Sequence, residues 1–86
     1  ANLADEKILI YPNPNQGYFR VQLQSKQEYS NLSLELFNIN GKIIQSQKFN
    51  TMNEYINVSD IAKPGLYFLR ISNNGSYLLS KKIIIQ

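Results

Sequence analysis

The stretch GLYFLRISNNGSYLLSKKIII, residues 65–85, decides the fold class of this chain. Two runs rich in aliphatic and aromatic residues flank the pair Asn74-Gly75. An Asn-Gly pair favours a type I′ turn, because both central residues of that turn need positive φ, which asparagine tolerates and glycine accepts without strain. The stretch therefore predicts a β-hairpin that joins residues 66–73 to residues 76–85.

The register of this hairpin follows from the length of its turn. A plain two-residue loop places Ile71 opposite Leu78 and Tyr67 opposite Lys82. We expect the Tyr67 face to be buried, because it holds a single charge, Lys82, whose aliphatic stem can reach outward. This core face would carry Tyr67, Leu69, Ile71, Leu78 and Ile84, and the outer face Leu66, Phe68, Leu79, Ile83 and Ile85.

Outside this hairpin, short segments with alternating polarity indicate further half-buried strands. Phe19, Val21 and Leu23 share one side of their segment, and Leu32, Leu34 and Leu36 repeat the pattern. A second pair, Asn40-Gly41, is expected to join residues 32–39 to residues 42–49 by a type I′ turn. Only residues 59–65 could form a helical turn. About seven strands with turns between them predict an all-β fold, an antiparallel β-sandwich of immunoglobulin-like type.

Length and composition indicate a single globular domain and argue against catalysis. The chain has 86 residues, enough for one core, with 43% hydrophobic and 17% charged residues. It has no histidine and no cysteine, so the side chains best suited to acid-base or nucleophilic catalysis near neutral pH are missing. We expect no catalytic, cofactor or metal site. The formal charge of +3 is scattered and the apolar runs are short, which argues against nucleic acid as a partner and against a membrane span.

Three blocks of sequence carry a family resemblance. The first is Tyr11-Pro12-Asn13-Pro14 with Gly17, the second contains Phe37, Asn38, Gly41 and Lys42, and the third contains Ile61, Pro64, Gly65, Tyr67 and Arg70. Lys81, Lys82 and the closing IIIQ add a basic and aliphatic end. In this order, and over most of the chain, the blocks resemble the C-terminal sorting domain of the type IX secretion system of Gram-negative bacteria.

The resemblance implies a non-catalytic function. It implies a secretion signal that directs a larger cargo protein across the outer membrane, with residues 1–6 as a linker to the upstream cargo and residues 7–86 as the sorting domain. Its implied partners are the outer-membrane translocon and a sortase-like peptidase that removes the domain. The implied route leads through the periplasm to the cell surface or the extracellular space.

The resemblance also assigns roles to residues. We expect the translocon to recognise the end of the chain, by β-augmentation or by docking onto an exposed face. The recognition residues would be Lys81, Lys82, Ile83, Ile84, Ile85 and Gln86, and the fold that presents them would depend on Tyr11, Pro12, Asn13, Pro14, Gly17, Gly41, Lys42, Gly65 and Tyr67.

The motifs also have structural interpretations. Pro12 and Pro14 interrupt strand pairing, so the chain is expected to leave one sheet there and to re-enter at Tyr18. Tyr67 is expected to be buried with its hydroxyl capping a loop, as in a tyrosine corner, and Lys81-Lys82 to protect an exposed strand from edge pairing. Two other functions stay open at this point: a carbohydrate-binding or adhesive module that uses Tyr18, Tyr29, Tyr55 and Tyr77, and a structural spacer in a secreted enzyme.

Overall fold

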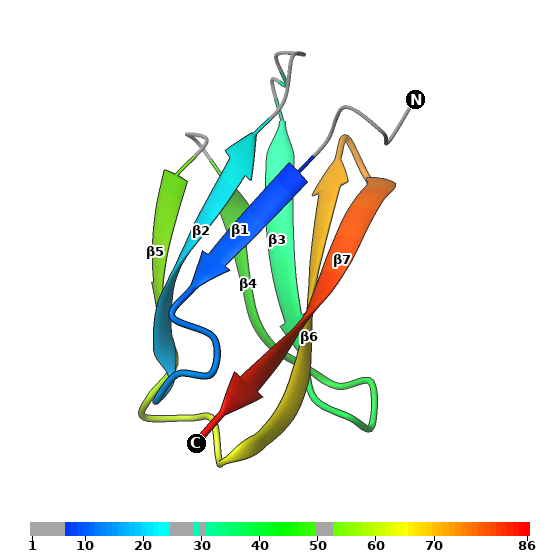
Figure 1. Ribbon diagram of the computed structural model, residues 1–86. Coiled ribbons are helices and arrows are strands. Elements are labelled where there is room, and N and C mark those ends of the chain that lie inside the picture. Colours follow the sequence, from blue (N-terminus) through cyan, green and yellow to red (C-terminus); the bar gives the residue numbers. More distant parts are fainter. Residues whose placement is uncertain (1–6, 25–28, 30, 50–52) are drawn as a thin grey trace.

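The computed structural model describes residues 7–24, 29, 31–49 and 53–86, and these form a sandwich of two antiparallel sheets (Figure 1). The three-stranded sheet has the order β1-β2-β5, and the four-stranded sheet has the order β4-β3-β6-β7. This arrangement confirms the all-β, immunoglobulin-like prediction. The strands are β1 (Lys7–Tyr11), β2 (Tyr18–Gln24), β3 (Leu32–Phe37), β4 (Ile43–Phe49), β5 (Asn53–Asn57), β6 (Gly65–Asn73) and β7 (Ser76–Ile85).

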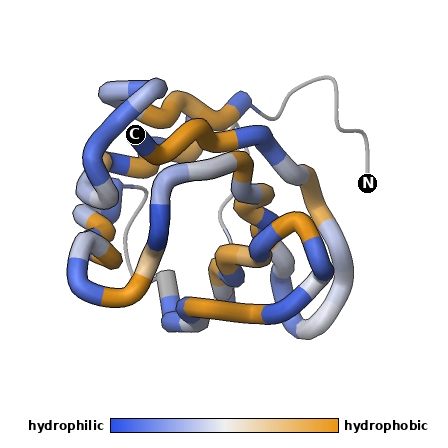
Figure 2. The backbone as a smooth tube through the Cα atoms, turned by 90° about the horizontal axis from the view of Figure 1, so that it is seen from below, coloured by the Kyte–Doolittle hydropathy of each residue, from blue (hydrophilic) through white to orange (hydrophobic). Residues whose placement is uncertain are grey.

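The core lies between the sheets and is built from the alternating positions of the strands. Phe19, Val21 and Leu23 from β2 are all buried. They face the alternating leucines of β3, of which Leu34 and Leu36 have no exposed surface. Apolar and polar residues alternate along β2, as expected when a strand has one face in the core and one in water, and Figure 2 shows apolar and polar stretches following one another along the chain.

The hairpin of β6 and β7 departs from the predicted register. The turn itself is as expected, with positive φ at Asn74 and Gly75. A bulge then shifts the pairing between Ile71 and Ser72, so that Ile71 pairs with Leu79 instead of Leu78. The extra residue turns every later position of β7 to the other side of the sheet.

This bulge corrects the predicted faces of the last strand. Tyr67 pairs with Ile83 and not with Lys82, which lies opposite Phe68 on the outer face. Ile83 and Ile85 are buried, with 0% and 3% of their surface exposed, while Ile84 is 48% exposed. The predicted placement of Ile84 in the core and of Ile83 and Ile85 outside it was therefore wrong, although Tyr67, Leu69, Ile71 and Leu78 are buried as predicted.

The connection between β3 and β4 also differs from its prediction. Asn40-Gly41 does join these strands, but only Gly41 has positive φ, so the turn is not of type I′. The amide of Gly41 donates to the carbonyl of Asn38, and the amide of Asn38 donates to the carbonyl of Lys42. These bonds describe a type I turn followed by a left-handed glycine. The side-chain oxygen of Asn38 accepts from the amides of Asn40 and Lys42 and completes the loop.

Candidate functional site

The YPNP motif and the last strand form one structure. The side chain of Asn13 donates through Nδ2 to the carbonyl of Lys82 at 3.1 Å, and its Oδ1 accepts from the amide of Ile84 at 3.1 Å. One asparagine side chain thus imitates the donor and acceptor of a neighbouring strand. In Figure 1 the loop after β1 lies beside the C-terminal end of β7.

The main chain of Asn15 extends this pairing to the last residue. Its amide donates to the carbonyl of Ile84 at 3.0 Å, and its carbonyl accepts from the amide of Gln86 at 2.7 Å. Asn15 and Ile85 form a parallel bridge. The chain therefore leaves the three-stranded sheet after Tyr11, contacts the edge of the four-stranded sheet, and re-enters the three-stranded sheet at Tyr18. The exit and the re-entry were predicted from the sequence. The contact with β7 was not predicted.

Asn15 also holds the loop in shape, a role that sequence reasoning missed. Its side chain is 3% exposed, donates to the carbonyl of Pro12 at 3.1 Å and accepts from the amide of Gly17 at 2.8 Å. A buried polar side chain is stable only when it is hydrogen-bonded in this way. The sequence offered one signal for the contact with β7, two asparagines two residues apart. Asn13 bonds to β7 through its side chain, and Asn15 bonds to it through its backbone.

Gly17 closes the loop against the segment that follows β5. It has a φ of 101°, and its carbonyl accepts from the amide of Val58 at 2.6 Å. A Cβ atom at this position would lie 2.8 Å from the Cα of Ser59. No side chain fits so close to backbone atoms, so the motif requires glycine here for both conformation and space.

The predicted recognition residues at the end of the chain divide into two groups. Ile83 and Ile85 are core residues and cannot contact a partner while the domain is folded. Lys81, Lys82, Ile84 and Gln86 are exposed. Lys82 and Ile84 lie opposite Phe68 and Leu66, so they share the outer face of the four-stranded sheet. Lys81 lies opposite the buried Leu69, on the core side of the sheet at its rim.

The position of β7 in the sheet agrees with the structural interpretation of the two lysines. β7 is an edge strand, and a charge that points inward at an edge disfavours pairing with another chain. Beyond Lys82, the edge is already occupied by Asn13 and Asn15. A strand from a partner could therefore add to β7 only before this point.

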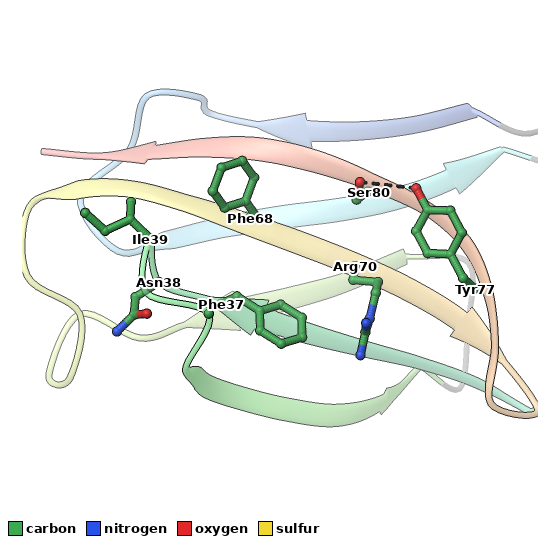
Figure 3. A pocket seen from close by; sticks show the side chains of 8 residues that line it. Phe37, Asn38, Ile39, Phe68, Arg70, Tyr77 and Ser80 are labelled. Carbon is green, nitrogen blue, oxygen red and sulfur yellow. Dashed lines mark hydrogen bonds between the residues drawn. The ribbon is translucent and has the colours of Figure 1, made fainter.

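The outer face of the four-stranded sheet carries an exposed apolar surface, which we call the Phe68 face. It consists of outward residues of the sheet and of the β3–β4 loop: Phe37, Ile39, Ile43, Leu66, Phe68, Tyr77, Lys82 and Ile84. A shallow depression of about 450 Å³ lies within it. Figure 3 shows Phe37, Phe68 and Arg70 lining this depression, with Ile39 at one end and Tyr77 at the other.

Arg70 gives this apolar surface its polar centre. Its guanidinium lies over the ring of Phe37, 4.8 Å from the centroid. Its Nη2 forms an ion pair with Oε1 of Glu35 at 2.6 Å. Arg70 and Glu35 neutralise each other in this pair, and Lys82 of the face and Lys42 of the adjoining β3–β4 loop add positive charge. A surface that combines exposed aromatic rings with a few fixed polar groups is typical of a protein contact.

The remaining motif residues lie at the tyrosine cap, at the start of β6, in the β3–β4 loop and around the Asn13 contact. Tyr67 is 7% exposed, and its hydroxyl donates to the carbonyl of Lys63 at 2.6 Å, which confirms the predicted loop cap. Gly65 begins β6. Gly41 and Lys42 lie in the β3–β4 loop, with Gly41 at the depression of the Phe68 face. Tyr11, Pro12 and Pro14 are exposed around the Asn13 contact.

Two features of metalloenzymes and membrane proteins are absent from the described ranges. There, no three histidine, cysteine or carboxylate side chains gather in a way that could hold a metal ion. The same ranges contain no helix of the length and apolarity needed to cross a bilayer. The depression on the Phe68 face is lined by no carboxylate and no group with a free thiol or imidazole.

Comparison with known proteins decides between the remaining functions. A family model described as "Secretion system C-terminal sorting domain" matches residues 9–86. This chain belongs to the type IX sorting domains. The match covers the YPNP loop, the tyrosine cap and the terminal strand, so the features that the fold brings together are those of the sorting domain. Such a domain is a non-catalytic secretion signal, it implies a translocon, and it implies export to the cell surface or the extracellular space.

A curated relative carries a similar segment within a longer protein. The sorting domain is 26% identical over 76 residues to a protein named ulvan lyase NLR42 from Nonlabens ulvanivorans. The alignment covers 88% of this chain but 14% of that protein. The relative is therefore a much longer protein in which the matched part is small.

Proposed function

We propose that the translocon reads this sorting domain in its folded form, by docking onto the Phe68 face beside the terminal strand. The observation that carries the proposal is the closure of the YPNP loop onto β7 through Asn13 and Asn15. The pairing of β7 with β6 places Lys82 and Ile84 next to Phe68 and Leu66 on one surface, and the closure holds the other edge of β7 in place. In an unfolded chain these residues would have no common geometry.

Docking on a face is favoured over strand addition for the end of β7. A partner strand would need free backbone groups along the edge, and those of Ile84 are bonded to the YPNP loop. The exposed rings and aliphatic side chains of the Phe68 face, in contrast, lose surface to water when a partner covers them, which favours association. Lys82 would add a charge contact at the rim of that interface.

Membership of the family supports a proposal for the fate of the domain. We propose that residues 1–6 connect the sorting domain to a larger upstream cargo, and that the domain folds in the periplasm before the translocon binds it. A sortase-like peptidase at the surface would then remove it as the cargo is released or anchored. The match to an ulvan lyase makes an enzyme one candidate for that cargo.

The test is a reporter protein fused ahead of residues 1–86 and expressed in a bacterium with a type IX system. Lys82→Glu combined with Ile84→Ser changes two exposed side chains of the Phe68 face and leaves the core intact. The matched control is Lys48→Glu, an exposed lysine of β4 at the other edge of the same sheet. We expect the double variant to remain in the periplasm and the control to be secreted. Secretion of the double variant at the normal level would contradict the proposal.

Deleting the last six residues would be a weaker test. It removes Ile83 and Ile85 from the core together with the surface residues, so loss of secretion could reflect unfolding. The point variants avoid this ambiguity, provided that circular dichroism and thermal unfolding of the purified domain show no change.

A further inference from the structure

The outer face of the three-stranded sheet carries a row of side chains that lies outside the proposed docking surface. Tyr11 of β1 pairs with Arg20 of β2, and Arg20 pairs with Tyr55 of β5. Residues directly opposite one another in neighbouring strands share a face, so the three side chains stand side by side across the whole sheet. Tyr18 lies on the same face two residues before Arg20, and the three tyrosines are 43–52% exposed.

The row is held by an aromatic-cation contact. The guanidinium carbon of Arg20 lies 5.6 Å from the centre of the Tyr55 ring, within the range of a cation-π interaction. The two flanking tyrosines are separated by two strand spacings, roughly 10 Å. An arginine is thus positioned between two half-exposed rings on a sheet surface.

The other outward positions of this sheet are cationic, amide or aliphatic. They are Lys7, Leu9, Gln22, Gln24, Asn53 and Asn57, which share the face through the same pairing. The carboxylate of the sheet belongs to Glu54, which lies opposite the buried Val21 and so is on the core side. Within the described strands, this outer face therefore holds two positive charges and no negative one.

We propose that this face binds an acidic polysaccharide, with sugar rings on the tyrosines and a uronate carboxylate at Arg20. A tyrosine ring offers an apolar surface to the C–H face of a pyranose while its hydroxyl stays in water. The planar guanidinium matches a carboxylate with two parallel hydrogen bonds, and the amides can bond to hydroxyl groups. Positive charge on the sheet complements negative charge on the polymer.

A single-stranded nucleic acid fits this face less well. Its affinity would depend on neutralising several phosphates, and this face offers one guanidinium and one distant ammonium group. A sugar chain needs fewer charges, because stacking and hydroxyl contacts supply most of the binding. The proposed site is independent of translocon docking, since it lies on the opposite outer face of the sandwich from Phe68.

The test is calorimetric titration of the 86-residue chain with a decasaccharide of galacturonic acid. The neutral galactose decasaccharide and a thymidine decanucleotide serve as comparison ligands. Tyr55→Ala removes one ring of the row, and Arg20→Gln removes the charge. The matched control is Tyr77→Ala, which removes a tyrosine of similar exposure from the other sheet.

We expect the galacturonate oligomer to bind and each of the two variants to weaken it about tenfold or more, with the control unchanged. The neutral oligomer should bind the wild-type chain about tenfold more weakly, and Arg20→Gln should reduce that difference. Absence of binding at millimolar galacturonate, binding of either variant with the affinity of the wild-type chain, or tighter binding of the decanucleotide would each overturn the proposal. Secretion of the reporter fusion should be unaffected by Arg20→Gln, which separates this site from the proposed function.

Discussion

Replacing Gly17 with alanine tests how the YPNP loop closes. The new Cβ would lie 2.8 Å from the Cα and 3.1 Å from the amide nitrogen of Ser59, both backbone atoms that cannot rotate away. A side chain at the φ of 101° costs about 1–2 kcal/mol, and overpacking costs about 1–3 kcal/mol more. Alanine also lowers the conformational entropy of the unfolded chain, which raises the free energy of unfolding by about 0.4–1 kcal/mol. We expect the free energy of unfolding to fall by about 2–4 kcal/mol.

The assay is urea unfolding of the isolated domain, followed by circular dichroism. With a slope of about 1 kcal/mol per molar urea for a domain of this size, the midpoint should fall by about 2–4 M. Gly41→Ala is the matched control, because Gly41 also has positive φ, 84°, but no atom within 4 Å of the new Cβ. If Gly17→Ala and Gly41→Ala lose the same free energy within about 0.5 kcal/mol, the close approach to Ser59 contributes nothing and the reasoning is refuted.

Three further predictions concern the end of the chain and the tyrosine cap. Ile83→Ala leaves a cavity at a fully buried position and should lower the free energy of unfolding by about 2–5 kcal/mol. Ile84→Ala changes an exposed position and should lower it by less than about 1 kcal/mol. Equal losses of the two variants in denaturant unfolding would argue against the bulged register. Asn13→Ala removes two bonds to the last strand, so hydrogen exchange at the Ile84 amide should become faster by NMR, and unchanged exchange would exclude the contact. Tyr67→Phe deletes the bond to Lys63 and should cost about 1 kcal/mol, seen as a lower midpoint of thermal unfolding, while an unchanged midpoint would show that the bond adds no net stability.

Much of the fold was predictable because it depends on local patterns. Alternation along β2 and β3 identified the core residues Phe19, Val21 and Leu23 and their partners, since a strand with one buried face must alternate. The Asn74-Gly75 turn was predictable because two consecutive residues with positive φ strongly restrict the sequence. The loop cap by Tyr67 followed from the same kind of local reasoning about a tyrosine after a glycine turn.

The features that were not predicted depend on contacts between distant residues or on small irregularities. A bulge between Ile71 and Ser72 has no sequence signal in a hairpin whose two faces are both rich in apolar residues, so the faces of the last strand could not be assigned. The bond between Asn13 and Ile84 joins residues that are 71 positions apart. Single-sequence patterns extend over a few residues and cannot reveal such a pair, and the backbone bonds of Asn15 to Ile84 and Gln86 were missed for the same reason. The side-chain bonds of Asn15 to Pro12 and Gly17 are local and were overlooked.

The distance along the chain between Asn13 and its partners bears on when the signal can first operate. Closing a loop of this length is among the last steps of folding to become favourable, because its entropy cost must be met by contacts already formed elsewhere. The hydrogen-bond partners of Asn13 and Asn15 do not exist until synthesis has passed Gln86. If the translocon binds the folded domain as we propose, a polypeptide that stops before Gln86 would lack the full closure of the YPNP loop and would be bound less well.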